Sequence, residues 1–583
     1  MRGQLKALRD KMKERGIDTY IVPTTDYHGS EYVNEYFKCR EYVSGFTGSA
    51  GTLVIRKDFA GLWTDGRYFL QAAQQLDGTG IELMKMGAPG VPSLADYLKD
   101  QPEGSVIGFD GRVVSRSLGE CLEGKFDIVY DRDLVGEIWT DRPEIVPSEI
   151  YEIGLDVTGE SSASKLSRVR EKMGDADHML VTRLEDIAWL YNLRGRDIEN
   201  TPVFYGFALI SKERDVLYVM DGRYVEKAGR SGQAGCSGQG LRVPGCIREY
   251  DKVFDDVSAL RDCSVILDEE SVSYYMARAF DDSVDRIYRK SIIEEMRAIK
   301  NEGEIAATRR AHIRDGAAVV NTIYWLKNNA GSGSISEMSL AEHLGEQRRQ
   351  QGAYEPSFDT IAGYEEHGAI VHYSATAETD VVLKAEGFLL IDSGGQYEDG
   401  TTDITRTVAL GPVDTQRRRD YTAVLKGHIA LATARFTEKE TGADLDALAR
   451  APLKELGLDF NHGTGHGVGH MLSVHEGPHT ISPRGTYCHI MPGTVTSDEP
   501  GVYLEGQYGI RIENELLCVE DGGARHFETL TFCPYEREAI ESSMLTENER
   551  RYVNSYHRKV LETLAPLLDE PVKKWLEEQC GEL

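Results

Sequence analysis

The sequence predicts an α/β (α+β) protein with two similar α/β domains followed by a larger domain, and three observations support this prediction. Residues 62–68 (LWTDGRY) recur as residues 218–224 (YVMDGRY). A basic segment with a helical pattern precedes each copy, at residues 5–15 and 166–173. Residues 388–410 form two apolar stretches around a turn rich in Gly and Asp, which is typical of a β-hairpin.

The repeat and the chain length set the expected domain boundaries. A chain of 583 residues is too long for one hydrophobic core and suggests three or four domains of about 150 residues each. The spacing of the repeat predicts one domain at residues 1–155 and a second at 156–295. A charged stretch from Ile292 leads into a helical pattern that reaches Trp325, which predicts that a third domain occupies residues 296–525.

The remaining residues, 526–583, form a C-terminal extension. A helical pattern runs from about residue 546 to residue 578. Leucines at intervals within it are the candidates for packing against the third domain: Leu561, Leu564, Leu567 and Leu568.

Composition excludes several classes of function. A formal net charge of −30 argues against nucleic-acid binding, since neutralising phosphates requires a basic surface. No segment approaches the roughly 20 apolar residues of a membrane span, and the first residues lack the apolar run of a signal peptide. Nine cysteines without a Cys-x-x-Cys pair suggest reduced thiols. We therefore expect a cytoplasmic protein with no membrane or nucleic-acid partner.

Two aspartates interrupt the predicted hairpin. Asp392 ends one apolar strand and Asp403 begins the next. A carboxylate in such a strand is costly unless a cation or hydrogen bonds compensate its charge. The pair therefore suggests a metal site.

Three further candidates follow in the chain. His466 lies at the centre of residues 461–470 (NHGTGHGVGH), which are too rich in glycine for an ordinary helix or strand. Glu499 lies in the turn at 497–501, and Glu513 lies in an expected strand at 509–515. In that strand Arg511 and Glu513 share one face. Four carboxylates and one imidazole suit two divalent ions, preferably Mn²⁺ and otherwise Co²⁺ or Zn²⁺, and such a pair supports hydrolysis.

The five candidate ligands resemble those of the metallopeptidase family with the pita-bread fold, which includes methionine aminopeptidase, prolidase and aminopeptidase P. The family's ligands follow the order Asp, Asp, His, Glu, Glu, and all five positions match. Within the family, the chain is most similar to the long three-domain form of Xaa-Pro aminopeptidase. The motifs that carry this likeness span nearly the whole chain: residues 44–51 (SGFTGSAG), 63–69 (WTDGRYF), 368–373 (GAIVHY), 462–469 (HGTGHGVG), 475–478 (HEGP), 498–501 (DEPG) and 509–514 (GIRIEN).

The resemblance implies a role for each ligand in a pita-bread catalytic domain. Asp403 and Glu513 would bridge the two ions, Asp392 would complete one of them, and His466 with Glu499 would complete the other. Glu499 would also accept the proton of the attacking water.

The resemblance also assigns other residues to the substrate. It places His372 and His475 at the peptide, where a neutral imidazole can donate to the developing oxyanion, and it places His462 nearby. His462 could equally hold the Gly-rich loop by hydrogen bonds, and His367 and His470 are expected to be structural. Other assignments concern the arginines and the proline pocket: Arg67 would reach the peptide and its counterpart Arg223 would be structural, Arg511 would bind a ligand carboxylate or lie on an edge strand as a surface cation, and Tyr354, Phe358 and Tyr373 are the unranked candidates for a wall around the proline ring.

The function implied is removal of the first residue from peptides with proline at position two, by a homodimer whose C-terminal extension supports the dimer. Prolidase, which cleaves only Xaa-Pro dipeptides, is the nearest alternative, although the duplicated domains and the extension favour the longer enzyme. A catalytically inactive pita-bread binding protein, or a metal-free creatinase-like enzyme, is the other alternative, and five intact ligands argue against both. Residues 374–380 (SATAETD) lack the proline expected after His372.

Overall fold

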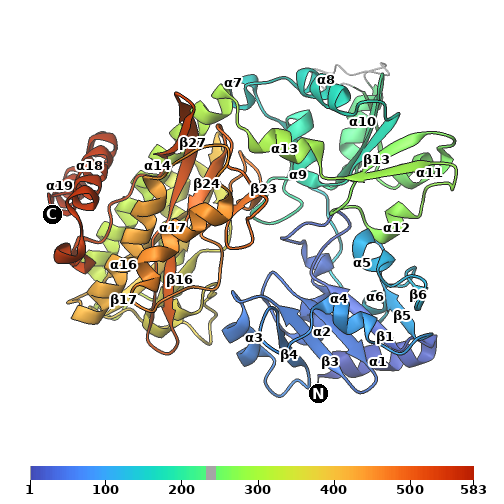
Figure 1. Cartoon of the computed structure of the whole chain (residues 1–583), viewed down its shortest axis with the longest axis horizontal. Coiled ribbons are helices and arrows are strands. Elements are labelled where there is room, and N and C mark those ends of the chain that lie inside the picture. Colours follow the sequence, from blue (N-terminus) through green and yellow to red (C-terminus); the bar gives the residue numbers. More distant parts are fainter. Residues whose placement is uncertain (1, 231–244) are drawn as a thin grey trace. The chain divides into compact units, whose positions relative to one another are not determined.

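The structure is a computed structural model that describes residues 2–230 and 245–583, and the chain divides into two compact units, Met1–Ile293 and Glu294–Leu583 (Figure 1). The first unit contains two α/β sheets and the second contains mixed sheets with long helices. The predicted fold class is therefore confirmed. Among the described residues, no helix has the length and the apolar character that crossing a membrane requires.

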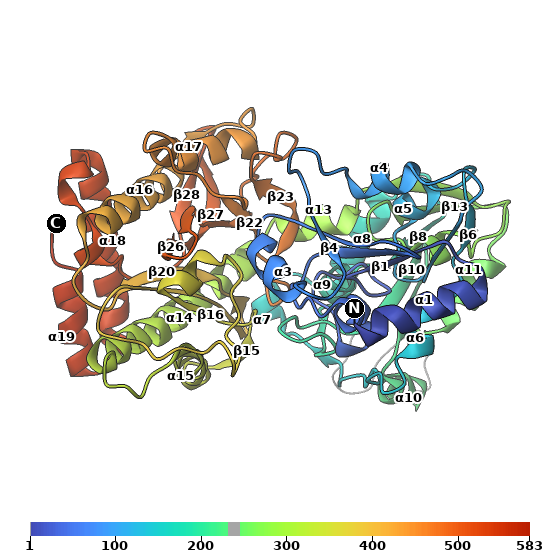
Figure 2. The same cartoon turned by 90° about the horizontal axis from the view of Figure 1, so that it is seen from below.

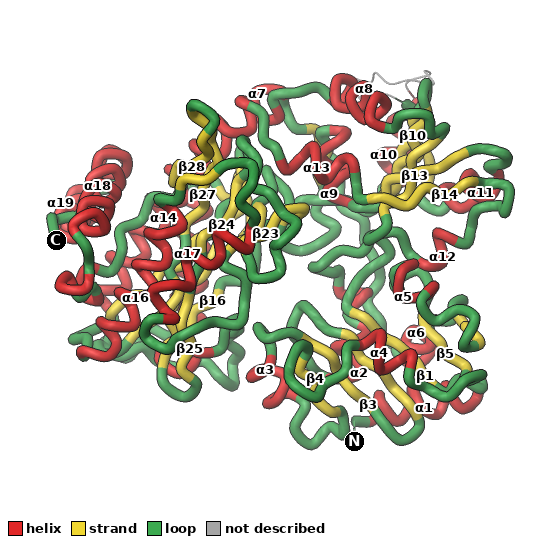
Figure 3. Tube along the Cα trace, in the orientation of Figure 1, coloured by secondary structure: helices red, strands yellow, loops and turns green. Residues whose placement is uncertain are grey.

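The two sheets of the first unit have the same topology. The strand orders are β4-β3-β2-β1-β5-β6 and β12-β11-β10-β8-β13-β14. In each, the three strands from the centre towards one edge are antiparallel, and the central strand is parallel to the next strand on its other side. The predicted duplication is thus visible in the backbone (Figure 3). The strands are β1 (Thr19–Pro23), β2 (Thr52–Arg56), β3 (Ala60–Thr64), β4 (Glu82–Lys85), β5 (Val106–Phe109) and β6 (Asp127–Val129), then β8 (His178–Val181), β10 (Gly206–Ser211), β11 (Asp215–Val219), β12 (Cys246–Glu249), β13 (Ser264–Asp268) and β14 (Asp285–Arg289).

Helices pack on both sheets through one apolar face. In α1 (Gly3–Arg15), Leu5, Leu8 and Met12 recur at helical spacing and are buried. Gly16 ends this helix at φ 68°, a conformation that glycine adopts without strain. The other helices of the first unit include α2 (Cys39–Ser44), α3 (Phe69–Gln75), α4 (Leu94–Lys99), α5 (Arg116–Glu120), α6 (Leu134–Ile138), α8 (Ser162–Lys172), α9 (Leu184–Tyr191), α10 (Gly222–Arg230), α11 (Lys252–Ala259) and α12 (Tyr274–Ala277).

A buried histidine joins the two halves of the first unit. His28, from the first half, contacts the carbonyl oxygen of Thr182 through Nδ1 and the hydroxyl of Tyr250 through Nε2, both at 2.7 Å. Burial lowers the pKa of His28 to about 3. The ring is therefore neutral, with Nδ1 donating and Nε2 accepting.

A 28-residue helix begins the second unit's core. α14 (Glu302–Asn329) starts at a capping box in which Asn301 and Glu304 satisfy each other's backbone amides. Its apolar face joins one cluster with the sheet β16-β17-β20 and with α16 and α18. The elements are α13 (Ile292–Ala298), α15 (Glu337–Gln350), α16 (Thr415–Ala432), α17 (Gly442–Lys454), β16 (Ile361–Tyr364), β17 (Phe388–Ser393) and β20 (Ile404–Ala409).

A second sheet carries the Gly-rich segment, with the strand order β21-β28-β27-β24-β22-β23. The segment was predicted to avoid regular structure, but Gly465–Gly467 forms the short strand β22. Here the absence of side chains allows close packing, because a Cβ on Gly465 would lie 2.1 Å from the carbonyl oxygen of Ser497. The other strands are β21 (Arg435–Phe436), β23 (Glu476–Ile481), β24 (Val495–Asp498), β27 (Asn514–Asp521) and β28 (Ala524–Thr529), and the separate pair is β25 (Gly501–Leu504) with β26 (Tyr508–Arg511).

The C-terminal extension is helical, as predicted. α18 (Glu547–Leu564) packs beside α14 and α16, and α19 (Glu570–Gln579) follows (Figures 1 and 2). Leu564 is fully buried, and Leu561 and Leu568 are partly buried against the same core. The prediction was wrong for Leu567, which lies in the short 3₁₀ turn between the helices and is 49% exposed. The eight described cysteines are unpaired, as expected, and Cys236 lies outside the described residues.

Candidate metal centre and active site

The predicted hairpin brings its two aspartates to one end. β17 and β20 are antiparallel, and Asp392 pairs with Thr405. The turn is longer than expected, because it contains two further short strands, β18 (Gly395–Tyr397) and β19 (Gly400–Thr401). Asp403 immediately precedes β20, and its backbone N–H donates to Glu515 Oε1 at 2.6 Å. The hairpin thus presents both carboxylates on the same edge.

The Gly-rich strand fixes the direction of the His466 ring. Its backbone N–H donates to Ser497 Oγ at 3.0 Å, and Nδ1 donates to the carbonyl oxygen of Gly467 at 2.9 Å. That bond leaves Nε2 as the nitrogen with the free lone pair. Nε2 lies 3.6 Å from Asp403 Oδ2 and 3.4 Å from Glu499 Oε1.

The two glutamates come from breaks in strands. Glu499 lies in the turn between β24 and β25, as predicted. Glu513 was expected inside a continuous strand, but β26 ends at Arg511 and β27 begins at Asn514. This break leaves the Glu513 carboxylate beside the hairpin, where Thr405 Oγ1 donates to Glu513 Oε2 at 2.6 Å.

The ligand atoms of Asp403, His466 and Glu513 all lie within 4.8 Å of one another. Burial raises the pKa of Asp403 and Glu513 well above the usual values, and the neighbouring carboxylates add to this increase. Burial likewise raises the pKa of Glu499 to about 7. Asp392 Oδ1 is buried without a hydrogen-bond partner. Crowded carboxylates and an unsatisfied buried oxygen fit divalent cations, which would compensate the negative charge.

Arg511 connects the metal centre to a second group of side chains. Its Nη2 donates to Asp392 Oδ2 at 2.5 Å and its Nη1 donates to the Tyr503 hydroxyl at 2.6 Å. Of the two roles considered for Arg511, the structure therefore favours the ion pair with a candidate ligand over the exposed cation, since the residue is buried.

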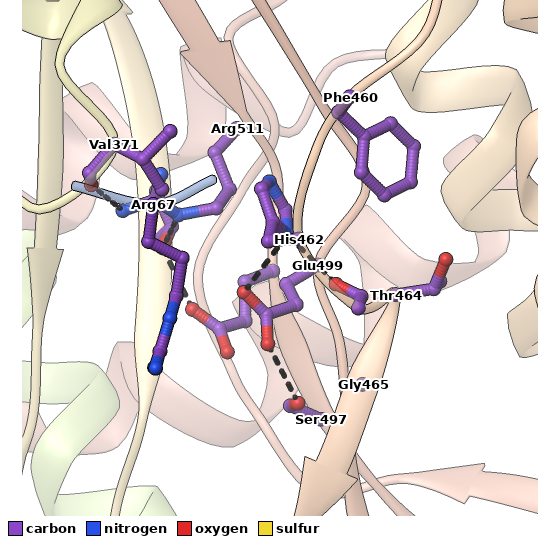
Figure 4. A network of polar contacts seen from close by, with 12 residues as sticks. Arg67, Val371, Phe460, His462, Thr464, Gly465, Ser497, Glu499 and Arg511 are labelled. Atoms are coloured by element: carbon purple, nitrogen blue, oxygen red, sulfur yellow. Dashed lines mark hydrogen bonds and ion pairs between the residues drawn. The ribbon is translucent and has the colours of Figure 1, made fainter. Parts of the chain in front are cut away.

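Tyr503 extends this network to His462. The Tyr503 hydroxyl lies 2.8 Å from His462 Nε2, and His462 Nδ1 lies 2.7 Å from the carbonyl oxygen of Gly463. His462 also approaches Glu499, with Nδ1 3.8 Å from Oε2 (Figure 4). Both ring nitrogens of His462 therefore already contact protein atoms.

Of the two histidines expected at the substrate, His475 lies directly beside the metal centre. Its ring meets the His466 ring edge to face at a centroid distance of 4.4 Å. His372 is half-buried and follows Val371, whose carbonyl oxygen accepts a bond from Arg511 at 3.4 Å. His367 and His470 have the structural contacts expected of them: His367 Nδ1 lies 2.9 Å from Glu337, and His470 Nδ1 lies 3.0 Å from the Thr308 hydroxyl.

Arg67 belongs to the other unit, and its geometry repeats in its counterpart. Arg67 Nε donates to Asp65 Oδ1 at 2.9 Å, and Arg223 Nε donates to Asp221 Oδ1 at 2.8 Å. Arg67 makes a second bond to Asp65, from Nη2 to Oδ2 at 2.8 Å. The side chain of Arg67 is 25% exposed and that of Arg223 is 62% exposed.

The candidate proline-wall residues lie in different settings. Tyr373 is buried, and its hydroxyl donates to Glu337 at 2.9 Å. The Tyr354 side chain is half-buried and Phe358 is half-buried in the loop before β16.

Sequence reasoning missed two side chains that orient the candidate ligands, Thr405 and Tyr503. Thr405 could have been found, because it lies two residues after Asp403 and positions i and i+2 of a strand share a face. Tyr503 has no such signal, since its partners Arg511 and His462 are distant in sequence and come together only through β25 pairing with β26.

Known families match the chain in the same four segments. Residues 306–520 match the model of metallopeptidase family M24, and residues 524–583 match the C-terminal region of peptidase M24. Residues 4–142 and 141–304 each match the Creatinase/Prolidase N-terminal domain. A probable Xaa-Pro aminopeptidase P of Laccaria bicolor is 37% identical over 611 residues, which cover 100% of this chain and 93% of that protein. The chain belongs to metallopeptidase family M24, in its Xaa-Pro aminopeptidase P branch.

Other relatives of this M24 metallopeptidase agree. Aminopeptidase P2 of Arabidopsis thaliana is 37% identical, with 96% of this chain and 85% of that protein covered. The crystal structure of an X-prolyl aminopeptidase from Caenorhabditis elegans, described as a cytosolic enzyme with a di-nuclear active site, has a TM-score of 0.92 at 32% identity and covers 100% of this chain and 99% of its own. The Xaa-Pro dipeptidase of Bacillus anthracis has a TM-score of 0.53 at 27% identity and covers only 64% of this chain.

Proposed function

We propose that this metallopeptidase uses two divalent metal ions to hydrolyse the N-terminal Xaa-Pro bond and thereby releases the first residue of peptides with proline at position two. The observation that carries the proposal is the convergence of Asp403, His466 and Glu513 within 4.8 Å in a chain whose relatives named Xaa-Pro aminopeptidase P match it over its whole length. Hydrolysis is the chemistry that paired divalent ions at such a site favour.

Five residues would hold the ions: Asp392, Asp403, His466, Glu499 and Glu513. When bound, the two ions would lower the pKa of a water molecule and polarise the scissile carbonyl. Asp403 and Glu513 would be shared between the ions, which is consistent with their burial at the centre of the site. Asp392 would complete one ion, while His466 and Glu499 would complete the other. The hard oxygen donors support Mn²⁺, with Co²⁺ or Zn²⁺ as alternatives.

Glu499 is the proposed general base. It lies next to His466 and accepts a hydrogen bond from Ser497 Oγ at 3.2 Å, which holds one carboxylate oxygen in place. A pKa near neutrality matches the requirement that a base accept a proton and later return it. The proton would pass to Glu499 and then to the leaving proline nitrogen, which as a tertiary amide carries no proton of its own.

The histidines have separate proposed roles. His475, beside His466, and His372 would donate to the carbonyl oxygen of the substrate as negative charge develops there. His462 would hold Tyr503, because both of its ring nitrogens are engaged, and would reach the substrate only indirectly. We also propose that Arg67 contacts the peptide, for which its ordered position against Asp65 is the available support.

Prolidase remains the second candidate because it shares the metal site. The Bacillus anthracis dipeptidase covers 64% of this chain, whereas the aminopeptidase from Caenorhabditis elegans covers all of it. The additional length therefore supports the aminopeptidase. An inactive binding protein is disfavoured because all five candidate ligands are present.

A tripeptide assay tests the proposal. Purified protein is incubated with Mn²⁺ and Arg-Pro-Pro, and the products are separated by mass spectrometry. Release of free arginine is expected. Cleavage of Xaa-Pro dipeptides alone would instead identify a prolidase, and absence of cleavage with Mn²⁺, Co²⁺ and Zn²⁺ would favour a binding protein.

The remaining proposals concern organisation. We propose domains at residues 1–155, 156–295 and 296–525 and an extension at 526–583, which the four matched segments support to within about 15 residues. A cytoplasmic homodimer is also proposed. The likeness to an enzyme described as cytosolic supports the location, and light scattering of the purified chain would test the dimer.

A further inference from the structure

A buried group of four charges lies behind His475. Glu476, the next residue, accepts an ion pair from Arg297 on one carboxylate oxygen and from Lys300 on the other. The side chains of Glu476 and Lys300 are 1% exposed and that of Arg297 is 4% exposed. Glu294 lies 3.8 Å from Arg297 and completes a group with two positive and two negative charges.

These charges connect two segments that are distant in the chain. Arg297 lies in α13, and Lys300 precedes the capping residue of α14. The backbone N–H of Lys300 also donates to the carbonyl oxygen of Gly493, at 2.9 Å. The positive partners are thus held by the start of a long, well-packed helix, which makes them a rigid anchor for Glu476.

The backbone that carries Glu476 is irregular and needs such an anchor. β22 and β23 pair at His466 with Thr480 but then at Gly467 with Glu476, so residues 477–479 bulge out of the ladder. Regular pairing therefore does not fix the position of His475. A close contact adds to the constraint, because a Cβ on Gly477 would lie 2.5 Å from Glu294 Oε1.

We infer that Glu476 is a positioning residue for catalysis: its buried ion pairs with Arg297 and Lys300 hold the start of β23 so that the His475 ring lies against His466. This inference rests on the proposed function, since it assumes that His475 acts on the substrate. Glu476 itself contacts neither the substrate nor the candidate ligands. Its effect is through the placement of the neighbouring imidazole.

The central variant is Glu476→Gln, which keeps the shape of the side chain and removes its charge. We expect kcat for an Xaa-Pro peptide to fall about 10- to 100-fold, the range seen when partners of active-site ligands are removed. The bound metal content is expected to stay the same. We also expect His475 to react faster with diethyl pyrocarbonate, as followed by mass spectrometry of its peptide, because the ring is no longer held against His466.

A charge-balanced double variant separates positioning from stability. Glu476→Gln alone leaves an excess positive charge in the interior, and the added change Lys300→Met removes that excess. The double variant should regain thermal stability relative to Glu476→Gln while its kcat stays low and its His475 stays reactive. It also provides a folded protein if the single variant fails to fold.

Glu528→Gln is the matched control, because it breaks an exposed ion pair with Arg309 in the same unit. This control should behave as the wild type. The inference is overturned if kcat recovers together with stability in the double variant, if the metal is lost, or if His475 keeps its wild-type reactivity. Failure of the wild type to cleave Xaa-Pro peptides would contradict the proposed function instead, and the His475 reactivity would still decide the inference.

Discussion

Arg511 donates from Nη2 to Asp392 Oδ2 at 2.5 Å, and the two side chains are only 2% and 12% exposed. The ion pair keeps Asp392 charged among other carboxylates and leaves its second oxygen, Oδ1, without a hydrogen bond. Because Arg511 also bonds Tyr503 and the Thr405 hydroxyl, one guanidinium holds three groups around the candidate metal centre. Its planar arrangement of donors suits this task better than a lysine ammonium would.

Replacing Arg511 with lysine should therefore weaken metal binding even though the charge is kept. We expect the affinity for Mn²⁺ to fall about 10- to 100-fold, as for other partners of metal ligands. Equilibrium dialysis against a chelator would measure the change. Arg309→Lys, in an exposed ion pair, is the control and should bind Mn²⁺ like the wild type; equal affinity in both variants would show that Arg511 does not orient the ligands.

Removal of the His475 side chain should separate turnover from metal binding. In His475→Ala we expect kcat to fall about 10²–10⁴-fold, the range for a group that assists proton transfer or charge development. The metal content, measured by atomic emission, should remain that of the wild type because His475 is not among the proposed ligands. His489→Ala, at an exposed histidine, serves as the control. Retention of the wild-type rate would remove His475 from the mechanism.

The duplicated Asp-Gly-Arg-Tyr motif offers a matched pair of arginines. Arg67→Ala should raise KM for longer peptides about tenfold, as expected for the loss of one hydrogen bond to a charged group. Arg223→Ala removes the same contact with an aspartate in the second copy and should leave KM unchanged. Steady-state kinetics with peptides of increasing length would compare the two. An unchanged KM in Arg67→Ala would contradict its proposed contact with the peptide.

Local patterns accounted for much of the site. The strand period predicted the hairpin with Asp392 and Asp403, and the repeated motif predicted two domains with the same strand order. The break before Asn514 and the short strand at Gly465 were not predicted, because both depend on contacts with other strands. Pairs such as Glu476 with Lys300 depend on tertiary packing, which brings together residues 176 positions apart.

The packing of α18 distinguishes two leucines that the sequence could not separate. Leu564 is fully buried and Leu567 is 49% exposed. Leu564→Ala should reduce the free energy of unfolding of the second unit by about 2–5 kcal/mol, whereas Leu567→Ala should have little effect on the fold of a single chain. Urea unfolding followed by hydrogen exchange of peptides from residues 547–564 would measure both. Equal destabilisation by the two changes would contradict the described packing.

His28 makes the first unit sensitive to acid, because the neutral ring joins its two halves through Thr182 and Tyr250. Burial lowers its pKa from 6.5 to about 3, so the unfolded chain takes up a proton at a higher pH than the folded chain does. The stabilisation is thus fully present above about pH 6.5 and is lost as the pH falls towards 3. Since one pKa unit corresponds to about 1.4 kcal/mol, wild-type protein should lose about 3 kcal/mol more than His28→Gln between about pH 7.5 and pH 4.5. Denaturant unfolding followed by hydrogen exchange of peptides from residues 19–56 and 178–211 would measure this difference, with His489→Gln as the control. The same pH dependence in wild type and His28→Gln would show that protonation of this ring does not limit the stability of the first unit.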